Sequence, residues 1–291
     1  MFFLRLVPIS GTFIKKNILM LDAENIKIQF WIDKLLSLGK NAFSLEILEI
    51  ELPNYTSIAI KRVLARLSSK GKILSIMKGY YLIITPQYAS KGILPPPLYM
   101  DGLMNYLSRP YYVGLLSAAA YHGASHQQPQ EFFVFTLTPA LRPISKRGQK
   151  INYTSIIEIN PNFLVDIKTE MGYLKVSNPI LTATDLIQFE KKIGGLNRAT
   201  TVLEELTETI TNEQLTDDIL NYVPVTTWQR LGFIWEEILH EKELADVLFE
   251  KLILNNKKKY RIPLKASKNT RNFSSVNRWN VIVNTSIETD F

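Results

Sequence analysis

Cysteine is absent from the 291 residues of this chain. Disulfide bridges and thiolate zinc sites are therefore excluded, and the composition suits a reducing compartment such as the cytosol. No apolar stretch approaches the roughly 18 uncharged residues of a membrane-spanning helix. The apolar start contains Arg5 and lacks the small-residue cleavage site of a secretory signal. We expect a cytoplasmic protein that does not associate with membranes, and we interpret residues 1–24 as an N-terminal extension in which Met20 is an alternative start.

Residues that carry metal chemistry are scarce. Histidine occurs only three times. His122 and His126 have a spacing that would place two imidazoles on one helix face, with Glu131 near them as a third metal ligand. Gly123 and the polar residues after it end such a helix at once, so we favour capping and local hydrogen bonding over a metal site.

Other catalytic patterns are also weak. No glycine-rich phosphate loop is present, because Gly194 and Gly195 are typical of a stop between two helices. Asp166 and Glu170, with Lys168 between them, resemble a nuclease carboxylate pair, but this spacing is common by chance. We expect no enzymatic activity, no metal and no cofactor, and keep an enzyme in the C-terminal half as the alternative.

Positive charge gathers at the two ends of the chain, whose formal net charge is +7. Residues 1–90 carry 12 basic and 6 acidic side chains, and residues 257–291 carry 8 and 2. The stretch between them carries 14 basic and 19 acidic side chains. Basic ends around an acidic middle predict a polyanionic partner that is contacted by specific elements.

The N-terminal region has the element order of a winged helix-turn-helix. Apolar residues recur at helical spacing over residues 25–38, and Ser44 then offers an N-cap to a short second helix. A third helix is predicted from Thr56 to Lys70, and β-type runs lie on both sides of Gly79. We predict a winged helix-turn-helix DNA-binding domain over residues 25–86.

The third helix separates an apolar face from a basic face. From Asn54 to Lys78 there is no acidic residue, whereas a solvated helix usually mixes charges of both signs. Arginine can reach guanine edges in the major groove, and lysine can contact phosphates. The predicted DNA-binding residues are Tyr55, Thr56, Ser57, Lys61, Arg62, Arg66, Lys72 and Lys78. The alternative is a winged helix that mediates protein contacts.

A proline-containing linker is predicted for residues 87–98, because three consecutive prolines cannot continue a helix or a sheet. Beyond it, residues 99–291 alternate helical and β-type patterns, which predicts a C-terminal domain with a small sheet and a helical half. We therefore expect an α+β protein in which a winged helix-turn-helix precedes a mixed α/β domain. Helices are predicted at 111–123, 184–193, 196–210, 227–239 and 242–254, and strands at 131–138, 150–159 and 172–176.

Two other segments are rich in basic residues, and both are candidates for phosphate contact or for a solubilising surface. One is a loop in the middle of the chain and the other is the tail. The possible second basic surface consists of Arg142, Lys146, Arg147, Lys150, Lys257, Lys258, Lys259 and Arg261. The apolar end "NRWNVIVN" predicts that the last residues fold back as a strand.

One block of the sequence resembles a known family. The stretch "YYVGLLSAAAYHGASHQQPQEFFVFT", Tyr111–Thr136, is similar to the segment after the winged helix in the AbiEi antitoxins. These are the regulatory partners of bacterial abortive-infection nucleotidyltransferase toxins. The stretches "RPISKRGQKINY" and Leu52–Ile83 fit the same family, and the resemblance covers most of the chain from about Asn25 onward.

The resemblance implies a cytoplasmic prokaryotic antitoxin, encoded beside its toxin, whose N-terminal domain represses the shared promoter by binding repeats in double-stranded DNA. It implies a type IV antitoxin action of the C-terminal domain, for which the two proteins need not form a tight complex. The family's DNA-reading helix corresponds to Thr56, Ser57, Lys61, Arg62 and Arg66. The alternatives are a nuclease or toxin-modifying enzyme in the C-terminal domain, or a module that binds the toxin directly.

Overall fold

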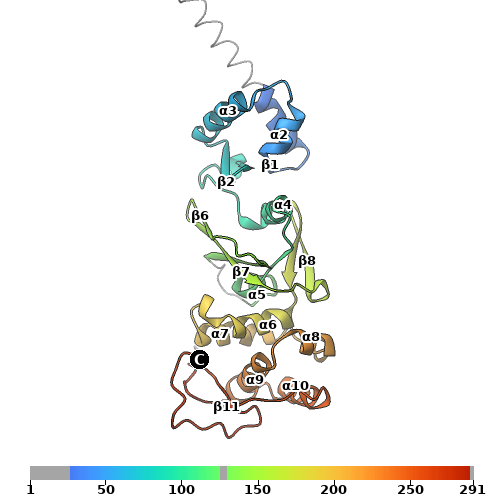
Figure 1. Ribbon diagram of the computed structural model, residues 1–291, viewed down its shortest axis with the longest axis vertical. Coiled ribbons are helices and arrows are strands. Elements are labelled where there is room, and N and C mark those ends of the chain that lie inside the picture. The colour runs from blue at the N-terminus through green and yellow to red at the C-terminus, as the bar shows by residue number, and fades with distance from the viewer. Residues whose placement is uncertain (1–26, 125–129, 289–291) are drawn as a thin grey trace, which may run out of the picture. The chain divides into compact units, whose positions relative to one another are not determined.

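The computed structural model describes residues 27–124 and 130–288. The predicted N-terminal extension of residues 1–24 and His126 lie outside these ranges. The described chain has an α+β fold and divides into two compact units (Figure 1). The first unit consists of the chain up to Leu107 together with Thr169–Gly172, and the second consists of Ser108–Lys168 and the chain from Tyr173 onward. Among the described helices, none combines the length and the apolar character that crossing a membrane requires.

The first unit contains three helices that precede a β-hairpin, as predicted, together with one short extra strand. A helix at residues 27–37 comes first. The strands form an antiparallel sheet in the order β1-β3-β2. Strand β1 is too short for its sequence to show a periodic pattern. The bounds are β1 Ala42–Ser44, α2 Leu45–Glu51, α3 Ser57–Ser69, β2 Ile73–Met77 and β3 Tyr80–Ile83.

Local capping explains where α2 and α3 begin. The Ser44 hydroxyl accepts a hydrogen bond from the Ile47 amide at 3.1 Å, and the Thr56 hydroxyl accepts one from the Ala59 amide at 3.2 Å. Each cap satisfies a backbone donor that has no partner within its helix. Gly79 adopts φ 80° in the β2–β3 turn, a conformation that glycine adopts without strain. The predicted caps and turn are confirmed.

The segment predicted as a linker is packed, which differs from the expectation of an extended spacer. Ile93 and Leu94 are buried, and the Asn41 side-chain amide donates to the Leu98 carbonyl at 2.9 Å. Helix α4 then follows, and the unit ends after it. The prolines initiate short turns here, because their fixed φ suits the first positions of a helix. The bounds are η1 Pro86–Tyr88, η2 Pro96–Leu98 and α4 Met100–Tyr106.

A six-stranded mixed sheet forms the first half of the second unit, with the strand order β6-β7-β5-β4-β9-β8. Strands β5 and β7 pair in parallel, as do β4 and β9, whereas β4–β5 and β6–β7 are antiparallel. The sheet is larger than the small one predicted. The bounds are β4 Tyr111–Val113, β5 Glu131–Leu137, β6 Ile144–Lys146, β7 Gln149–Ile156, β8 Leu164–Thr169 and β9 Gly172–Ser177, with the 3-10 turn η3 Pro161–Phe163 before β8.

The helix predicted over residues 111–123 is wrong in its first part. Residues Tyr111–Val113 form β4 between β5 and β9, and the helix α5 is limited to Leu115–Tyr121. Two aromatic residues and a valine favour a strand when neighbours on both sides complete the sheet. Gly114 separates the two elements, and a Cβ atom there would lie 2.5 Å from the Phe135 ring.

Helices make up most of the rest of the second unit, and Figure 1 shows α6 and α7 side by side. Helix α6 begins earlier than predicted because the Asn178 side chain caps it by accepting from the Leu181 amide. The apolar helix faces share one core with α5 and β5. The bounds are α6 Pro179–Gln188, η4 Glu190–Lys192, α7 Leu196–Thr207, η5 Asn212–Gln214, α8 Asp217–Tyr222, α9 Val225–Phe233, the π-helix η6 Ile234–Ile238 and α10 Lys242–Leu254.

Candidate nucleic-acid interface

Helix α3 presents one apolar face and one basic face, as its sequence predicts. Its buried residues are Ile60, Val63, Leu64 and Leu67, which belong to the core of the first unit. The side chains of Lys61 and Arg62 are exposed and that of Arg66 is half-buried. None of the ion pairs between described residues involves a cation of α3. The positive charge of this face is therefore available to an external anion.

The residues at the start of α3 have structural roles that the sequence pattern did not separate from DNA contact. Thr56 caps the helix through its side-chain oxygen. Tyr55 is half-buried and packs against the core of the first unit. Ser57 is exposed at the first helical position. Substitution of Thr56 or Tyr55 would therefore disturb the helix itself as well as any ligand at its N-terminus.

The two hairpin lysines lie at opposite ends of β2. The Lys72 amide donates to the Leu67 carbonyl at 3.0 Å, which holds it beside the end of α3, and its ammonium donates to Gln29 at 3.2 Å. Lys78 follows the other end of the strand, about 20 Å away at roughly 3.3 Å per residue. Its carbonyl accepts from the Tyr106 hydroxyl at 3.3 Å. Lys72 thus extends the α3 surface, whereas Lys78 lies apart from it.

Much of the negative charge of the first unit lies on α2, and Asp33 on the first helix and Asp101 on α4 add to it. Glu46 and Glu51 are exposed on α2, and Glu51 accepts a hydrogen bond from the Trp31 indole at 2.7 Å. Acidic side chains repel the phosphate backbone of DNA, and the effect is strongest within a Debye length of about 10 Å. The α3 face is therefore the part of this unit that best suits a polyanion.

The predicted basic loop in the second unit is a tight β-hairpin. Arg147 and Gly148 form the turn between β6 and β7 with φ angles of 49° and 80°. Lys150 forms an ion pair with Glu131 at 2.8 Å, while Arg142 and Arg147 are exposed. Lys146 is half-buried. The strand pairing therefore separates these four cations into different environments, and phosphate binding by them stays a prediction.

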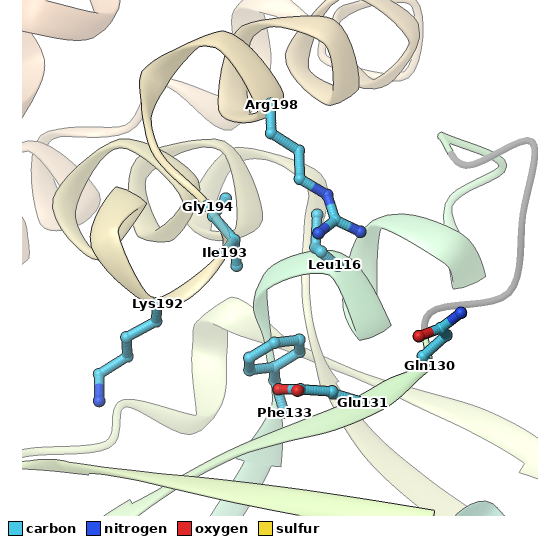
Figure 2. A pocket seen from close by; sticks show the side chains of 8 residues that line it. All are labelled: Leu116, Gln130, Glu131, Phe133, Lys192, Ile193, Gly194 and Arg198. Carbon is cyan, nitrogen blue, oxygen red and sulfur yellow. The ribbon is translucent and has the colours of Figure 1, made fainter.

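A pocket of about 210 Å³ opens in the second unit between β5, α5 and the start of α7 (Figure 2). The sequence analysis did not identify it. Arg198 extends from α7 toward the pocket, Lys192 points away from Arg198 on the left of the view, and Glu131 and Phe133 lie on the strand below. The only local sign was the pair Gly194–Gly195, which correctly indicated a helix stop: both residues have φ near 100°.

The basic tail is folded against the helical half. Strand β11 (Val281–Ile282) pairs in parallel with β10 (Ile262–Pro263), so the predicted return as a strand is confirmed. Lys257 donates to Asn221, Lys259 donates to the Arg278 carbonyl at 2.8 Å, and Arg261 donates to Ser275 at 3.0 Å. Lys258 is exposed, with its ammonium 5.7 Å from the Tyr260 ring.

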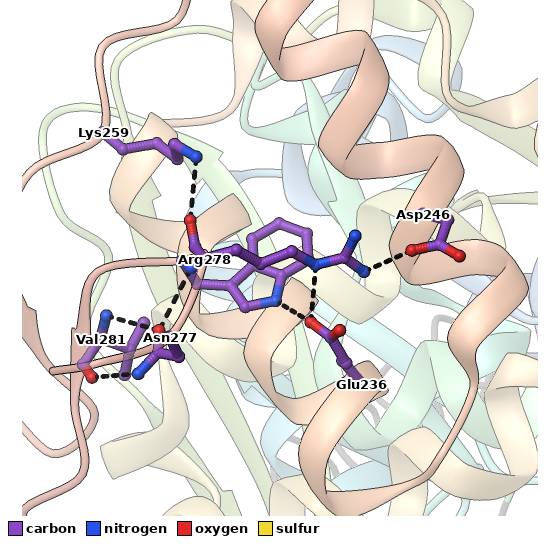
Figure 3. A network of polar contacts seen from close by, with 7 residues as sticks. Glu236, Asp246, Lys259, Asn277, Arg278 and Val281 are labelled. Carbon is purple, nitrogen blue, oxygen red and sulfur yellow. Dashed lines mark hydrogen bonds and ion pairs between the residues drawn. The ribbon is translucent and has the colours of Figure 1, made fainter.

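A polar network anchors this tail to the π-helix η6 (Figure 3). One Glu236 carboxylate oxygen accepts hydrogen bonds from the Arg278 guanidinium at 2.8 Å and from the Trp279 indole at 2.6 Å. The same guanidinium pairs with Asp246 at 2.6 Å, and the Trp279 ring is fully buried. Several tail cations thus hold the fold together, a role the sequence pattern did not reveal.

The weak catalytic patterns do not assemble into a site within the described residues. The His122 ring is half-buried, which lowers its pKa, and its Nε2 lies 2.7 Å from the Ser177 carbonyl. No group of three or more described His, Asp or Glu side chains is placed to hold a metal ion. Asp166 pairs with Lys175 at 2.7 Å on the exposed strand β8, and Lys168 and Glu170 are also exposed.

Comparison with known proteins decides the family. Residues 112–237 match the family model described as the AbiEi antitoxin C-terminal domain. The chain therefore contains an AbiEi antitoxin C-terminal domain. The resemblance seen in Tyr111–Thr136 is confirmed, and an antitoxin role within a toxin-antitoxin system, with a toxin as partner, follows from it. No curated protein matches the antitoxin sequence.

The solved structures support the fold. The antitoxin is similar to the crystal structure of the RV2827C protein from Mycobacterium tuberculosis, with a TM-score of 0.62 and 15% sequence identity. The similarity covers 86% of the antitoxin and 89% of the other chain. At this identity the likeness shows the fold alone. The family match itself covers neither α3 nor the tail, so it leaves the α3 surface to be argued on physical grounds.

Proposed function

We propose that this AbiEi antitoxin binds operator DNA through a winged helix-turn-helix in its first unit and represses its own operon. The observation that carries the proposal is the exposed basic face of α3, whose cations have no acidic partner among the described residues. The order of elements in this unit, from the helix at 27–37 to the β2–β3 hairpin, supports the same proposal.

In this proposal α3 lies in the major groove. Lys61, Arg62 and Arg66 supply base and phosphate contacts, and Lys72 adds a phosphate contact beside the end of the helix. Ser57 lies at the helix N-terminus, where backbone donors favour a phosphate. Lys78 lies at the far end of β2, so it contacts DNA only if the β2–β3 hairpin runs along the duplex beyond α3.

The second unit is proposed to counteract a nucleotidyltransferase toxin. In this proposal the second unit does not act as an enzyme. Support comes from the family match, which lies within this unit except for Thr169–Gly172. Among the described residues, the candidate metal and nuclease groups are separated or paired, which gives the enzyme alternative no assembled site. Both activities fit a protein of the bacterial cytoplasm.

The test is fluorescence anisotropy with a duplex from just upstream of the gene and with a scrambled duplex of the same composition. We expect specific binding to the operator duplex. The logarithm of the association constant should fall linearly with the logarithm of the salt concentration, with a slope of about −0.9 for each phosphate contact. Replacing Lys61, Arg62 and Arg66 by glutamine should reduce the magnitude of this slope by up to about 2.7 and abolish the preference for the operator.

A matched triple variant controls for net charge. Lys27, Lys34 and Lys40 are exposed in the same unit but lie on or just after its first helix, so replacing them by glutamine removes the same charge from another surface. We expect this control to keep the operator preference. An equal loss of operator preference in both triple variants would show that net charge alone drives the interaction. Unchanged operator binding by the α3 triple variant would refute the proposal.

A further inference from the structure

We propose that the pocket beside α7 binds the phosphate and sugar of a small phosphorylated pentose, either free or as part of a mononucleotide. The inference concerns the second unit only and does not depend on DNA binding by the first. Three features of the pocket carry it: two cations without ion pairs from its helical side, a carboxylate on the strand across from them, and apolar side chains between.

The cationic wall comes from Lys192, at the end of η4, and Arg198, in the first turn of α7. Both side chains are exposed, and neither forms an ion pair with a described residue. A cation in the first turn is also unfavourable for the helix, since it faces the positive end of the helix dipole. The Glu131 carboxylate attracts Arg198 without forming an ion pair with it, so an external anion would supply the direct partner that this cation lacks among the described residues.

The opposite wall is the Glu131 carboxylate on β5. It accepts hydrogen bonds from the Lys150 ammonium at 2.8 Å and from the Asn152 side-chain amide. These two donors lower the pKa of Glu131, and the positive charge of Arg198 contributes to the same shift. Each carboxylate oxygen can accept a further hydrogen bond. An ionised carboxylate that is fixed in position and partly exposed is a suitable acceptor for ligand hydroxyl groups.

Charge and size together indicate the ligand class. A phosphate group accepts a two-pronged hydrogen bond from the Arg198 guanidinium, and Lys192 supplies a second positive charge at another side of the pocket, whereas a carboxylate carries only one negative charge. Hydroxyl groups on the same molecule would reach Glu131 across the pocket, over the apolar side chains of Leu116, Phe133 and Ile193. The volume of about 210 Å³ suits a sugar phosphate, because pockets for larger ligands measure roughly 300–1,000 Å³.

The test is isothermal titration calorimetry of the full chain with ribose 5-phosphate, AMP, inorganic phosphate and ribose. We expect ribose 5-phosphate to bind at least about tenfold more tightly than inorganic phosphate, and ribose alone to give no measurable heat. AMP binding more tightly than ribose 5-phosphate would identify a mononucleotide as the source of the group, and equal binding would identify a free sugar phosphate. Inorganic phosphate binding as tightly as ribose 5-phosphate would overturn the sugar assignment.

Single substitutions test the cationic side and the carboxylate side of the pocket separately. Arg198→Gln and Lys192→Gln should each weaken ribose 5-phosphate binding at least about tenfold, whereas Lys191→Gln, an exposed neighbour that does not line the pocket, should leave it unchanged. Glu131→Gln should reduce the preference for ribose 5-phosphate over inorganic phosphate.

Thermal melts and operator binding of Arg198→Gln and Lys192→Gln should match those of the parent protein, because these exposed cations form no ion pair with a described residue. Absence of binding by every phosphorylated probe at millimolar concentration, or undiminished binding by Arg198→Gln, would overturn the proposal.

Discussion

The buried carboxyl group of Asp185 should make the stability of the second unit depend on pH. Asp185 lies on α6 with 4% of its surface exposed, and its described side-chain partner is the Tyr112 hydroxyl, which donates to it at 3.1 Å. Burial raises the pKa of Asp185 well above its ordinary value of 3.8, and the hydrogen bond from Tyr112 offsets this only in part. The folded state therefore retains a proton that the unfolded state has lost.

The sign and size of the effect follow from this difference in bound protons. Below pH 3.8 both states are protonated and the group has no effect. Above that pH, the free energy of unfolding falls by about 1.4 kcal/mol for each pH unit until the folded-state pKa is reached. Over two pH units the loss is about 2.7 kcal/mol, a large part of the roughly 5–15 kcal/mol by which domains are stable.

Asp185→Asn removes the titration and keeps the shape of the side chain. We expect the free energy of unfolding of this variant to gain about 1.4 kcal/mol per pH unit relative to the parent as the pH rises above 3.8 toward the folded-state pKa of Asp185. A constant offset from the new amide, whose NH₂ lacks a partner, does not change the slope. Urea unfolding can be followed by the fluorescence of Trp228, Trp235 and Trp279, which are fully buried in the same unit.

The exposed residue Asp218 provides a matched control. Asp218→Asn should give a pH profile parallel to that of the parent protein, because this side chain is exposed and not buried. If the Asp185→Asn profile is also parallel to that of the parent, the buried carboxyl must be ionised in the folded protein, and the reasoning from its burial fails.

Two further predictions concern the tail and the toxin. Trp279→Ala should lower the free energy of unfolding by about 3–5 kcal/mol in urea melts, because it leaves a cavity, whereas Val276→Ala, at a side chain that is 97% exposed, should change it by less than about 0.5 kcal/mol. A small effect at Trp279 would show that the tail is not part of the core. In cells expressing the adjacent toxin gene, the α3 triple variant, expressed from an unrelated promoter, should restore growth as well as the parent does. Failure to do so would contradict the assignment of antitoxin action to the second unit.

The sequence by itself determined the elements whose causes are local. The caps at Ser44 and Thr56 and the turn at Gly79 depend on neighbouring residues, so short patterns predict them. The apolar face of α3 follows from helical periodicity, and the basic face follows from the absence of acidic residues around it. The resemblance to the AbiEi antitoxins could also be seen in the sequence, because the block Tyr111–Thr136 is distinctive.

Only the tertiary structure decided which residues meet across the chain. Tyr111–Val113 became a strand because β5 and β9 lie on both sides of it. The tail cation Arg278 became an anchor because Glu236 and Asp246 both pair with it. The pocket joins Glu131 to Arg198 across 67 positions (198 − 131) that no periodic pattern links. Long-range pairing of strands and side chains depends on how helices and sheets pack, which local spacing does not encode.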